Sequence, residues 1–282
     1  MKDFKDKNIV VTGAGSGLGR HFAIQLYQAG ARLALCDIDL PGLSETISQI
    51  GENEDRISIH QVDVADKDQV DQFSADVQAR YGPADLLINN AGICLIPQPF
   101  EEINEDTFKQ VIDVNLWGAY HMIRAFLPQL RTRPEAGIVN ISSLAGIVGL
   151  YGHSAYSMSK AGLRGLSETL QSELAGSQVH LTLVHPGGVR TNLIKNAPNL
   201  EEDLQDKAHN NFTQLSFLTS EKTVSRIIKA IQNKKNRAVI GFDARLILLI
   251  RALFPRKYPK MIALIFSQAN FKDDPVWKTK NQ

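Results

Sequence analysis

The chain has 282 residues, of which 43% are hydrophobic and 22% are charged. These ordinary globular values exclude a disordered, collagen-like or disulfide-rich protein. The 31 Lys and Arg residues nearly balance the 30 Asp and Glu residues, and a net charge of +1 provides no overall field that would attract nucleic acid. Two cysteines, Cys36 and Cys94, are too few for a disulfide framework or a cysteine metal site, which favours a reducing, cytoplasmic setting.

Short β-branched segments alternate with longer helical segments through the first 240 residues. This alternation predicts an α/β fold with a single Rossmann-type doubly wound sheet of about seven parallel strands, because strands this apolar must be covered by helices on both faces. The predicted strands span residues 8–12, 32–36, 57–61, 85–89, 137–142, 179–184 and 237–240. The predicted helices span residues 17–29, 41–50, 67–80, 104–127, 156–175 and 221–233.

No Pro- or Ser-rich linker interrupts this alternation, so residues 1–241 are predicted to form one domain. The N-terminal residues carry charges of both signs and do not form a signal peptide. The apolar run 261–266 is far shorter than the roughly 18 residues that a spanning helix needs. The protein is therefore expected to be soluble or at most peripheral to a membrane.

A glycine-rich turn follows the first predicted strand and leads into a helix. The strict GxGxxG spacing is absent, and the pattern is TGxxxGxG through Gly13, Gly17 and Gly19. Glycines permit a tight turn and let the backbone approach a pyrophosphate, which binds the amides at the N-terminus of the next helix. Taken alone, such a turn is also compatible with a simple strand-to-helix connection.

Two aspartates follow the next strands. Asp37 ends the second strand, 18 residues after Gly19, where its carboxylate can accept hydrogen bonds from adenosine ribose hydroxyls. It would repel a 2′-phosphate, and neither Ala14 nor Ile38 supplies a cation, so the sequence favours NAD over NADP. Asp63 follows the third strand and is a candidate adenine contact. Both aspartates have a second interpretation, as capping or turn residues.

Tyr156 and Lys160 lie four residues apart, so on a helix they project from one face. A nearby cation favours a phenolate and would bring the phenol toward proton exchange with an alcohol or carbonyl oxygen. This spacing is common by itself. Here, however, Ser143 follows the fifth strand and residues 89–92 end the fourth, and these strand ends share one sheet edge with the glycine turn.

Together these motifs resemble the classical short-chain dehydrogenase/reductase family over about residues 5–240. The matching features are TGxxxGxG at 12–19, NNAG at 89–92, Asn115, Ser143, YxxxK at 156–160, and Pro186-Gly187 with Thr191. The resemblance implies a Rossmann-type oxidoreductase that moves a hydride between NAD(H) and a small hydrophobic alcohol or carbonyl compound. It also implies a homodimer or homotetramer, formed through the helices after the fourth and fifth strands.

The resemblance assigns a role to each of four catalytic residues. Tyr156 corresponds to the general acid/base, and Ser143 to the hydroxyl that holds the substrate oxygen. Lys160 corresponds to the cation beside Tyr156 and a ligand of the nicotinamide ribose, and Asn115 supports a water that leads protons away from Lys160. Ser143 is preferred to Ser142 because the serine of the family lies 13 residues before its tyrosine.

The cofactor contacts that the same motifs imply lie in the glycine turn, at the strand ends and after the sixth strand. The main chain of Val189 and the hydroxyl of Thr191 correspond to the carboxamide contacts. The alternative is an NAD-sensing or scaffold protein without turnover, against which the complete catalytic set argues. The full predicted NAD-binding set is Gly13, Ser16, Gly17, Leu18, Gly19, Asp37, Asp63, Val64, Asn90, Ala91, Gly92, Tyr156, Lys160, Pro186, Gly187, Val189 and Thr191.

Apolar segments 93–96 and 144–150 should border the nicotinamide, and they form either a hydrophobic substrate pocket or a packing layer beneath the loops. The polar segment from about 190 to 220 resembles the substrate lid of the family. His153 and His185 are interpreted as structural, and no ligand-spaced pair predicts a metal site.

Residues 242–282 form a predicted amphipathic C-terminal extension beyond the dinucleotide-binding and catalytic domain of residues 1–241. Between residues 243 and 266, apolar runs alternate with five cations and one acid, Asp243. This composition fits peripheral contact with anionic lipid, a helix that closes the substrate pocket, or a packing surface between subunits. Pro255 and Pro259 argue against one continuous helix. The cations are Arg245, Arg251, Arg256, Lys257 and Lys260.

Overall fold

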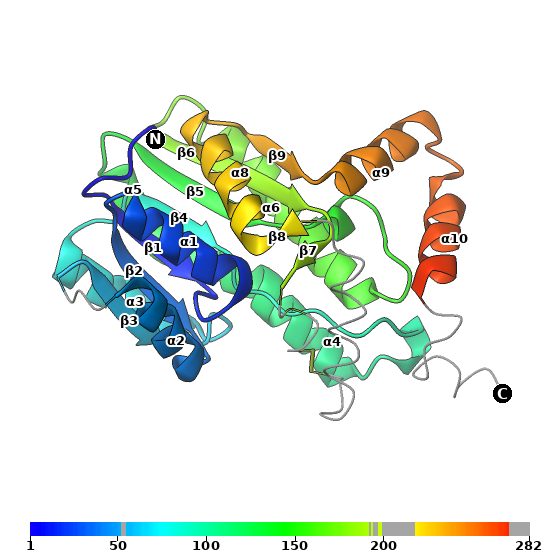
Figure 1. The fold of residues 1–282 in the computed structure, drawn as a ribbon, viewed down its shortest axis with the longest axis horizontal. Helices are drawn as coiled ribbons and strands as arrows, with labels where there is room; N and C mark the ends of the chain where they lie inside the picture. Colours follow the sequence, from blue (N-terminus) through cyan, green and yellow to red (C-terminus); the bar gives the residue numbers. More distant parts are fainter. Residues whose placement is uncertain (52–54, 192, 194–196, 199–217, 271–282) are drawn as a thin grey trace.

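A computed structural model describes the chain except for residues 52–54, 192, 194–196, 199–217 and 271–282 (Figure 1). The main strands are β1 (Asn8–Thr12), β2 (Arg32–Asp37), β3 (Ile57–Gln61), β4 (Leu86–Asn89), β5 (Ala136–Ile141), β6 (Val179–Pro186) and β9 (Arg237–Ile240). Two short strands, β7 (Val189–Arg190) and β8 (Leu218–Thr219), pair with each other. The α-helices are α1 (Gly17–Gln28), α2 (Leu40–Ile50), α3 (Lys67–Tyr81), α4 (Glu105–Ile112), α5 (Gly118–Arg131), α6 (Ser154–Glu173), α8 (Ser220–Gln232), α9 (Phe242–Leu253) and α10 (Tyr258–Asn270).

The seven main strands form one parallel sheet in the order β3-β2-β1-β4-β5-β6-β9, which confirms the predicted fold. β1 pairs with β2 on one side and with β4 on the other, both in parallel. The order in which successive strands are added to the sheet therefore reverses at β1. In an open α/β sheet, such a switch point leaves a crevice at the carboxyl ends of the strands, where ligands bind. The glycine turn after β1 and the segment after β4 both lie at this edge.

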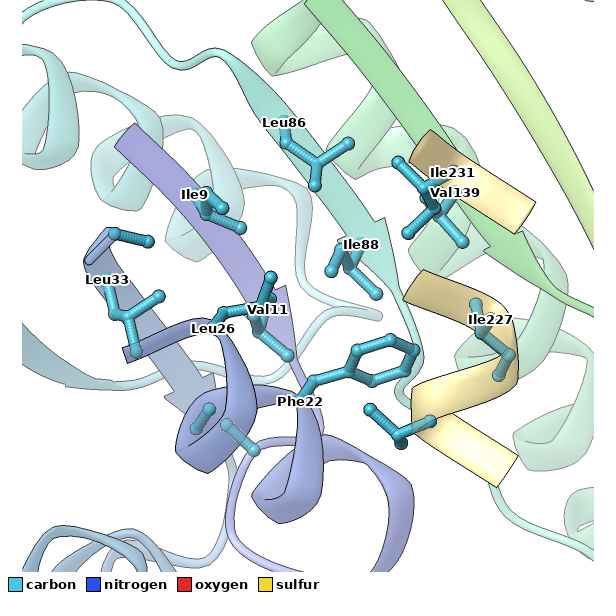
Figure 2. Close-up of a cluster of buried hydrophobic side chains, with 14 of the residues drawn as sticks. Ile9, Val11, Phe22, Leu26, Leu33, Leu86, Ile88, Val139, Ile227 and Ile231 are labelled. Atoms are coloured by element: carbon cyan, nitrogen blue, oxygen red, sulfur yellow. The ribbon is translucent and has the colours of Figure 1, made fainter. Parts of the chain in front are cut away.

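Helices cover both faces of the sheet, and successive side chains of one strand belong to different layers. Ile9 and Val11 of β1 pack with α1, α2 and α8, whereas Val10 packs with α3 and α5. Figure 2 shows the first of these layers, in which Phe22 of α1 lies between the sheet and Ile227 of α8. Because both faces of the strands are buried, apolar side chains occupy consecutive strand positions.

The helix predicted over residues 104–127 is interrupted at its centre. α4 and α5 are joined by a π-helical segment, η2 (Asp113–Trp117), and Asn115 of this segment is buried. A π-turn widens the helix and shifts the direction of its side chains, and such turns are frequent at functional sites. The interruption lets Asn115 face the end of β4.

The C-terminal extension contains two helices that are separated by residues 254–257. Pro255 lies between them, and Pro259 lies in the first turn of α10, where a missing amide hydrogen costs no helical bond. The buried residues Ala244 and Ile247 of α9 and Ile262 of α10 pack on the segment after β5. Among the described residues, no helix combines the length and apolar character needed to cross a bilayer.

Candidate active site

The glycine turn adopts the backbone that its sequence predicts. Gly13 and Gly17 have φ values of +65° and +51°, which side chains other than glycine rarely adopt. Gly19, in the first turn of α1, lies so close to the glycine turn that an added Cβ would overlap the carbonyl oxygen of Gly13. Ser16, the N-cap residue, makes no side-chain bond to the first turn of α1, and this turn carries no acidic residue. Its amides can therefore bind an anionic pyrophosphate.

Hydrogen bonds join the end of β4 to this turn. Thr12 Oγ1 accepts from the backbone amides of Asn90 at 3.0 Å and Ala91 at 2.9 Å. The Asn90 side chain donates to the carbonyl oxygens of Thr12 at 3.0 Å and Gly13 at 3.2 Å. A Cβ on Gly92 would lie only 3.1 Å from Lys160 Nζ. The NNAG motif thus connects the glycine turn to the buried lysine.

The Asp37 carboxylate lies directly beside the glycine turn. Its Oδ2 accepts from the Gly15 amide at 2.8 Å, and its Oδ1 accepts from the Asp39 amide at 3.1 Å. Burial raises the pKa of Asp37, and these backbone hydrogen bonds offset part of that shift. Each oxygen keeps a further lone pair for a ribose hydroxyl.

The helix-capping interpretation of the two aspartates is wrong. Asp39 accepts from the Gly42 amide and caps α2, and Asp66 caps α3. Asp63 instead accepts from the Ala65 amide at 2.9 Å in the turn after β3. Val64, in the same turn, packs against the position where Gly118 begins α5.

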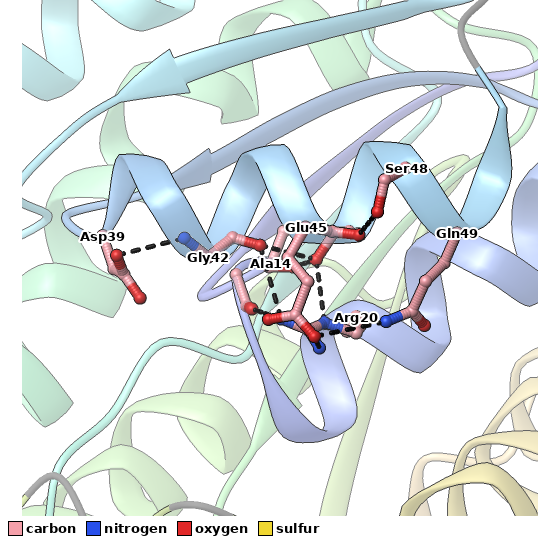
Figure 3. A network of polar contacts seen from close by, with 9 residues as sticks. Ala14, Arg20, Asp39, Gly42, Glu45, Ser48 and Gln49 are labelled. Carbon is pink, nitrogen blue, oxygen red and sulfur yellow. Dashed lines mark hydrogen bonds and ion pairs between the residues drawn. The ribbon is translucent and has the colours of Figure 1, made fainter.

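One cation near the turn was not predicted from the sequence, in which Ala14 and Ile38 are uncharged. Arg20 on α1 donates to the carbonyl oxygen of Gly15, the residue whose amide Asp37 binds. Figure 3 shows Arg20 beside Glu45. Its guanidinium forms two hydrogen bonds of 2.6 and 2.7 Å with Glu45 of α2, and this pairing lowers the pKa of Glu45. Arg20 lies one helical turn after Ser16, and this spacing was the available sequence signal.

Tyr156 and Lys160 occupy the first turns of α6, and the Lys160 side chain is buried beneath the strand ends. Lys160 is 4% exposed, and its Nζ donates to the carbonyl oxygen of Ile141 at 3.0 Å. The ammonium lies 5.7 Å from the centre of the Tyr156 ring. Burial lowers the pKa of Lys160 to about 8.

In this structure burial, rather than the neighbouring cation, sets the direction of the shift in the pKa of Tyr156. Burial raises the pKa of Tyr156, and a hydrogen bond with the Ser143 side chain offsets only part of the shift. Tyr156 therefore holds its proton. The neighbouring Cys94 thiol is also buried, which raises its pKa to about 12 and keeps it neutral near pH 7.

The two adjacent serines have different partners. Ser143 reaches Tyr156, and its Oγ also accepts from the Ala145 amide at 3.1 Å. Ser142 points to the other side of the strand and donates to the carbonyl oxygen of Lys160 at 3.0 Å. The structure thus brings Ser143, rather than Ser142, to the phenol.

Asn115 connects the interrupted helix to the site. Its Oδ1 accepts from the Ile93 amide at 2.8 Å, and its Nδ2 donates to the Ile93 carbonyl at 2.8 Å and to Ser159 Oγ at 3.0 Å. A Cβ on Gly92 would lie 2.9 Å from Asn115 Oδ1. Asn115 therefore fixes the chain after β4 against α6.

Both histidines near the site are neutral near pH 7, because burial lowers each pKa to about 4. His185 Nδ1 lies 3.0 Å from the carbonyl oxygen of Ser143, so it supports this strand end through the main chain. The His153 ring lies 6.3 Å from the Tyr156 ring. In the part of the chain that the structure describes, no group of His, Cys, Asp and Glu could hold a metal ion.

The loop after β6 lies between the glycine turn and the C-terminal extension. The Gly188 amide donates to Asp243 Oδ2 at 2.7 Å, and a side chain on Gly187 would overlap the same carboxylate. Thr191 lies across from Gly17, whose added Cβ would approach it to 3.4 Å. Pro186 and Val189 flank this contact on β6 and β7. Most of the predicted lid, residues 192, 194–196 and 199–217, lies outside the described residues.

The apolar segments next to the site are partly used for internal packing. Leu95 is fully buried with Val111 and Ala155. Ile147 and Val148 are buried against the C-terminal extension. The packing interpretation holds for these positions and for the buried Cys94, Leu144 and Ala145. Ile93, Ile96 and Leu150 are only partly buried.

A glycine turn at the sheet switch point, with a Ser–Tyr–Lys cluster on the same edge, defines a dinucleotide-binding oxidoreductase fold. The sequence model of the family named short chain dehydrogenase matches residues 7–202, and the chain belongs to this family. A Mycobacterium tuberculosis protein named as an oxidoreductase, SadH, is 33% identical over 269 residues, which cover 93% of this chain and 96% of that protein.

Two further proteins extend the comparison. The 3-oxoacyl-[acyl-carrier-protein] reductase FabG of Thermotoga maritima is 29% identical over 86% of this chain and 98% of its own length. A short-chain dehydrogenase/reductase from Burkholderia phymatum, crystallised in complex with NAD, has a TM-score of 0.82 with 24% identity. It covers 98% of this chain and 99% of its own chain, and it shows the shared fold.

We expect Gly19→Ala to disturb the turn, because the new Cβ would overlap the Gly13 carbonyl oxygen. The free energy of unfolding should fall by about 1–3 kcal/mol, and NADH binding should weaken with it. Denaturant unfolding and NADH fluorescence titration measure both effects. Gly165→Ala is the matched control, because Gly165 lies on α6 with open space around it, and alanine should stabilise this helix by up to about 1 kcal/mol. Equal behaviour of the two variants would contradict the assigned turn geometry.

Proposed function

We propose that the protein is an NAD-dependent oxidoreductase that interconverts a small hydrophobic alcohol and the corresponding carbonyl compound. The observation that carries this proposal is the Tyr156 phenol, which is hydrogen-bonded to Ser143 and lies beside the buried Lys160 ammonium. Both contacts occur at the carboxyl edge of the sheet, next to the glycine turn. A proton donor and a dinucleotide turn on one edge suit hydride transfer coupled to proton transfer.

Each residue has a defined task in this mechanism. The nicotinamide supplies or accepts the hydride when the cofactor is bound. In carbonyl reduction, the Tyr156 hydroxyl donates its proton to the substrate oxygen, which Ser143 holds in position. Lys160 stabilises the phenolate that remains, and the reverse transfer occurs in alcohol oxidation. Asn115 fixes the chain beside Lys160 and, by the family resemblance, supports a water that leads protons away.

The residues around the turn fit a dinucleotide. Positive φ angles at Gly13 and Gly17 let the main chain approach a pyrophosphate, and the uncapped first turn of α1 offers amide donors. The Asp37 carboxylate favours NAD, since it can accept from ribose hydroxyls and would repel a 2′-phosphate. Arg20 does not offset this preference, because Glu45 neutralises it. Other predicted contacts are Ser16, Leu18, Gly19, Asp63, Val64, Asn90, Ala91, Gly92, Tyr156, Lys160, Pro186, Gly187, Val189 and Thr191.

The proposed substrate is hydrophobic. Apolar side chains near Tyr156, including the partly buried Ile93, support this assignment. The relative from Thermotoga maritima is named for a 3-oxoacyl substrate, which carries a ketone on an acyl chain. A homodimer or homotetramer in the cytoplasm is the expected assembly and setting, and the mass of the protein in solution tests the first of these.

Replacement of Tyr156 by Phe tests the proton donor. The hydroxyl is lost while the buried ring is kept, so turnover should fall by roughly 10²-fold or more and NADH binding should change little. Tyr120→Phe on α5, outside the site, is the control. The measurement is NADH formation with a panel of hydrophobic alcohols, and near-normal turnover of the Tyr156 variant would eliminate the mechanism. Absence of turnover by the wild type with the whole panel would favour the NAD-sensing or scaffold alternative.

Replacement of Asp37 by Asn tests the cofactor preference. The variant keeps one acceptor oxygen, enough for one of the Gly15 and Asp39 amides, and loses the charge that repels a 2′-phosphate. The ratio of kcat/KM for NAD to that for NADP should fall by about tenfold or more, in line with roughly 1–3 kcal/mol for a charge-assisted contact. Asp39→Asn, which changes the neighbouring carboxylate, should leave the ratio unchanged. A wild-type preference for NADP would refute the assignment of Asp37.

A further inference from the structure

Helix α9 exposes a continuous apolar stripe. Phe242, Leu246, Leu249 and Leu253 are 78%, 44%, 54% and 62% exposed. Their spacings of four, three and four residues place them on one face of the helix. Phe254, 46% exposed, extends the stripe beyond the end of α9. Contiguous exposed apolar surface of this kind marks an interaction site.

The opposite side of α9 is already in contact with the domain. Ala244 and Ile247 are buried against the segment after β5, and the Arg251 guanidinium donates to the carbonyl oxygen of Ile147. Asp243 accepts from the Gly188 amide. The inner face of α9 thus provides its attachment, and the outer stripe is left for a partner. Figure 1 shows α9 and α10 projecting beyond the sheet and its covering helices.

Four exposed cations border the stripe. Arg245, Arg256, Lys257 and Lys260 are all exposed. Asp243 is the one acidic residue in the sequence from 242 to 264, and its carboxylate is bound to the Gly188 amide. Within the described part of the chain, no ion pair neutralises these four cations. The surface therefore combines exposed apolar side chains with a local positive charge, although the whole chain has a net charge of only +1.

We propose that this surface, formed by residues 242–260 of α9 and the start of α10, docks reversibly on an anionic lipid membrane. The apolar stripe enters the boundary between headgroups and acyl chains, and the flanking cations contact the anionic headgroups. A second copy of this chain fits less well. A two-fold contact through the same surface would place two sets of four cations together, and Asp243, the acid that the described part of this surface contains, is bound to the Gly188 amide.

Docking would also position the site. The inner face of α9 packs on Ile147 and Val148, which follow Ser143 in the chain. The membrane surface would therefore lie next to the segment that borders the proposed substrate site. This link between docking and the substrate site rests on the proposed function. Membrane binding by the stripe itself does not, since it requires no turnover.

The direct test is sedimentation of the full chain with vesicles. One set contains phosphatidylcholine alone, and the other contains phosphatidylcholine with 30 mol% phosphatidylserine, which is roughly the anionic fraction that makes a cytoplasmic leaflet attractive to cations. The protein should sediment with the anionic vesicles at low salt and be released as salt is raised, because the headgroup attraction is screened. Binding should be much weaker with phosphatidylcholine alone.

Two triple variants separate the apolar and ionic contributions. Phe242→Gln/Leu249→Gln/Leu253→Gln should weaken binding by at least about tenfold, because it removes most of the inserting side chains. Arg256→Gln/Lys257→Gln/Lys260→Gln should weaken it by roughly 100-fold at low salt. The matched control removes the same number of exposed cations from α8, as Lys222→Gln/Arg226→Gln/Lys229→Gln, and should bind as the wild type does. Unchanged melting temperatures and NADH binding show that each variant is folded.

Three results would overturn the proposal. The first is wild-type protein that stays in the supernatant with anionic vesicles at low salt. The second is equal loss of binding in the α8 control and in the Arg256/Lys257/Lys260 variant, which would indicate a non-specific charge effect. The third is a wild-type protein that binds no vesicles, together with an apolar variant that forms a smaller oligomer than the wild type. This result would assign the stripe to contact between copies of the chain.

Discussion

The burial of the Lys160 ammonium is the constraint on which the site depends. An isolated charge is expensive to bury, and Lys160 Nζ donates to an uncharged partner, the carbonyl oxygen of Ile141. The position of Nζ is set by α6, by the end of β5 and by Gly92, where a side chain would crowd it. These three segments come from separate parts of the sequence, so the location of the charge requires the whole sheet edge to be assembled.

The same edge is held together by backbone contacts of polar side chains. Thr12 ties the chain after β4 to the glycine turn, Asn115 ties it to α6, and His185 supports the Ser143 main chain. The π-helical segment makes the Asn115 contact geometrically available. On its outer side, Asp243 connects the loop after β6 to α9. The C-terminal extension is therefore attached to the site that it adjoins.

The seven parallel strands and the shared helix face of Tyr156 and Lys160 were predicted from short-range patterns, whereas Ser143 was assigned by the family resemblance. Strand periodicity, the glycine turn and the four-residue helical spacing are all local. Properties that depend on neighbours distant in sequence were missed, such as the Arg20–Glu45 pair between two helices. The raised pKa of Tyr156 belongs to this second class, because the extent of burial is set by the assembled edge and outweighs the cation that the local motif reveals.

The pH dependence of kcat/KM for carbonyl reduction tests the central claim most directly, since this constant reports the ionisation of the free enzyme. Lys160 loses its charge through about pH 8, while Tyr156 keeps its proton well above this pH. The expected profile is level in the acidic to neutral range and falls about tenfold per pH unit above about pH 8, as expected for the loss of one required proton. A kcat/KM that stays constant until roughly pH 10, near the pKa of an unperturbed lysine, would contradict the assignment of a buried, charged Lys160 to the proton-transfer step.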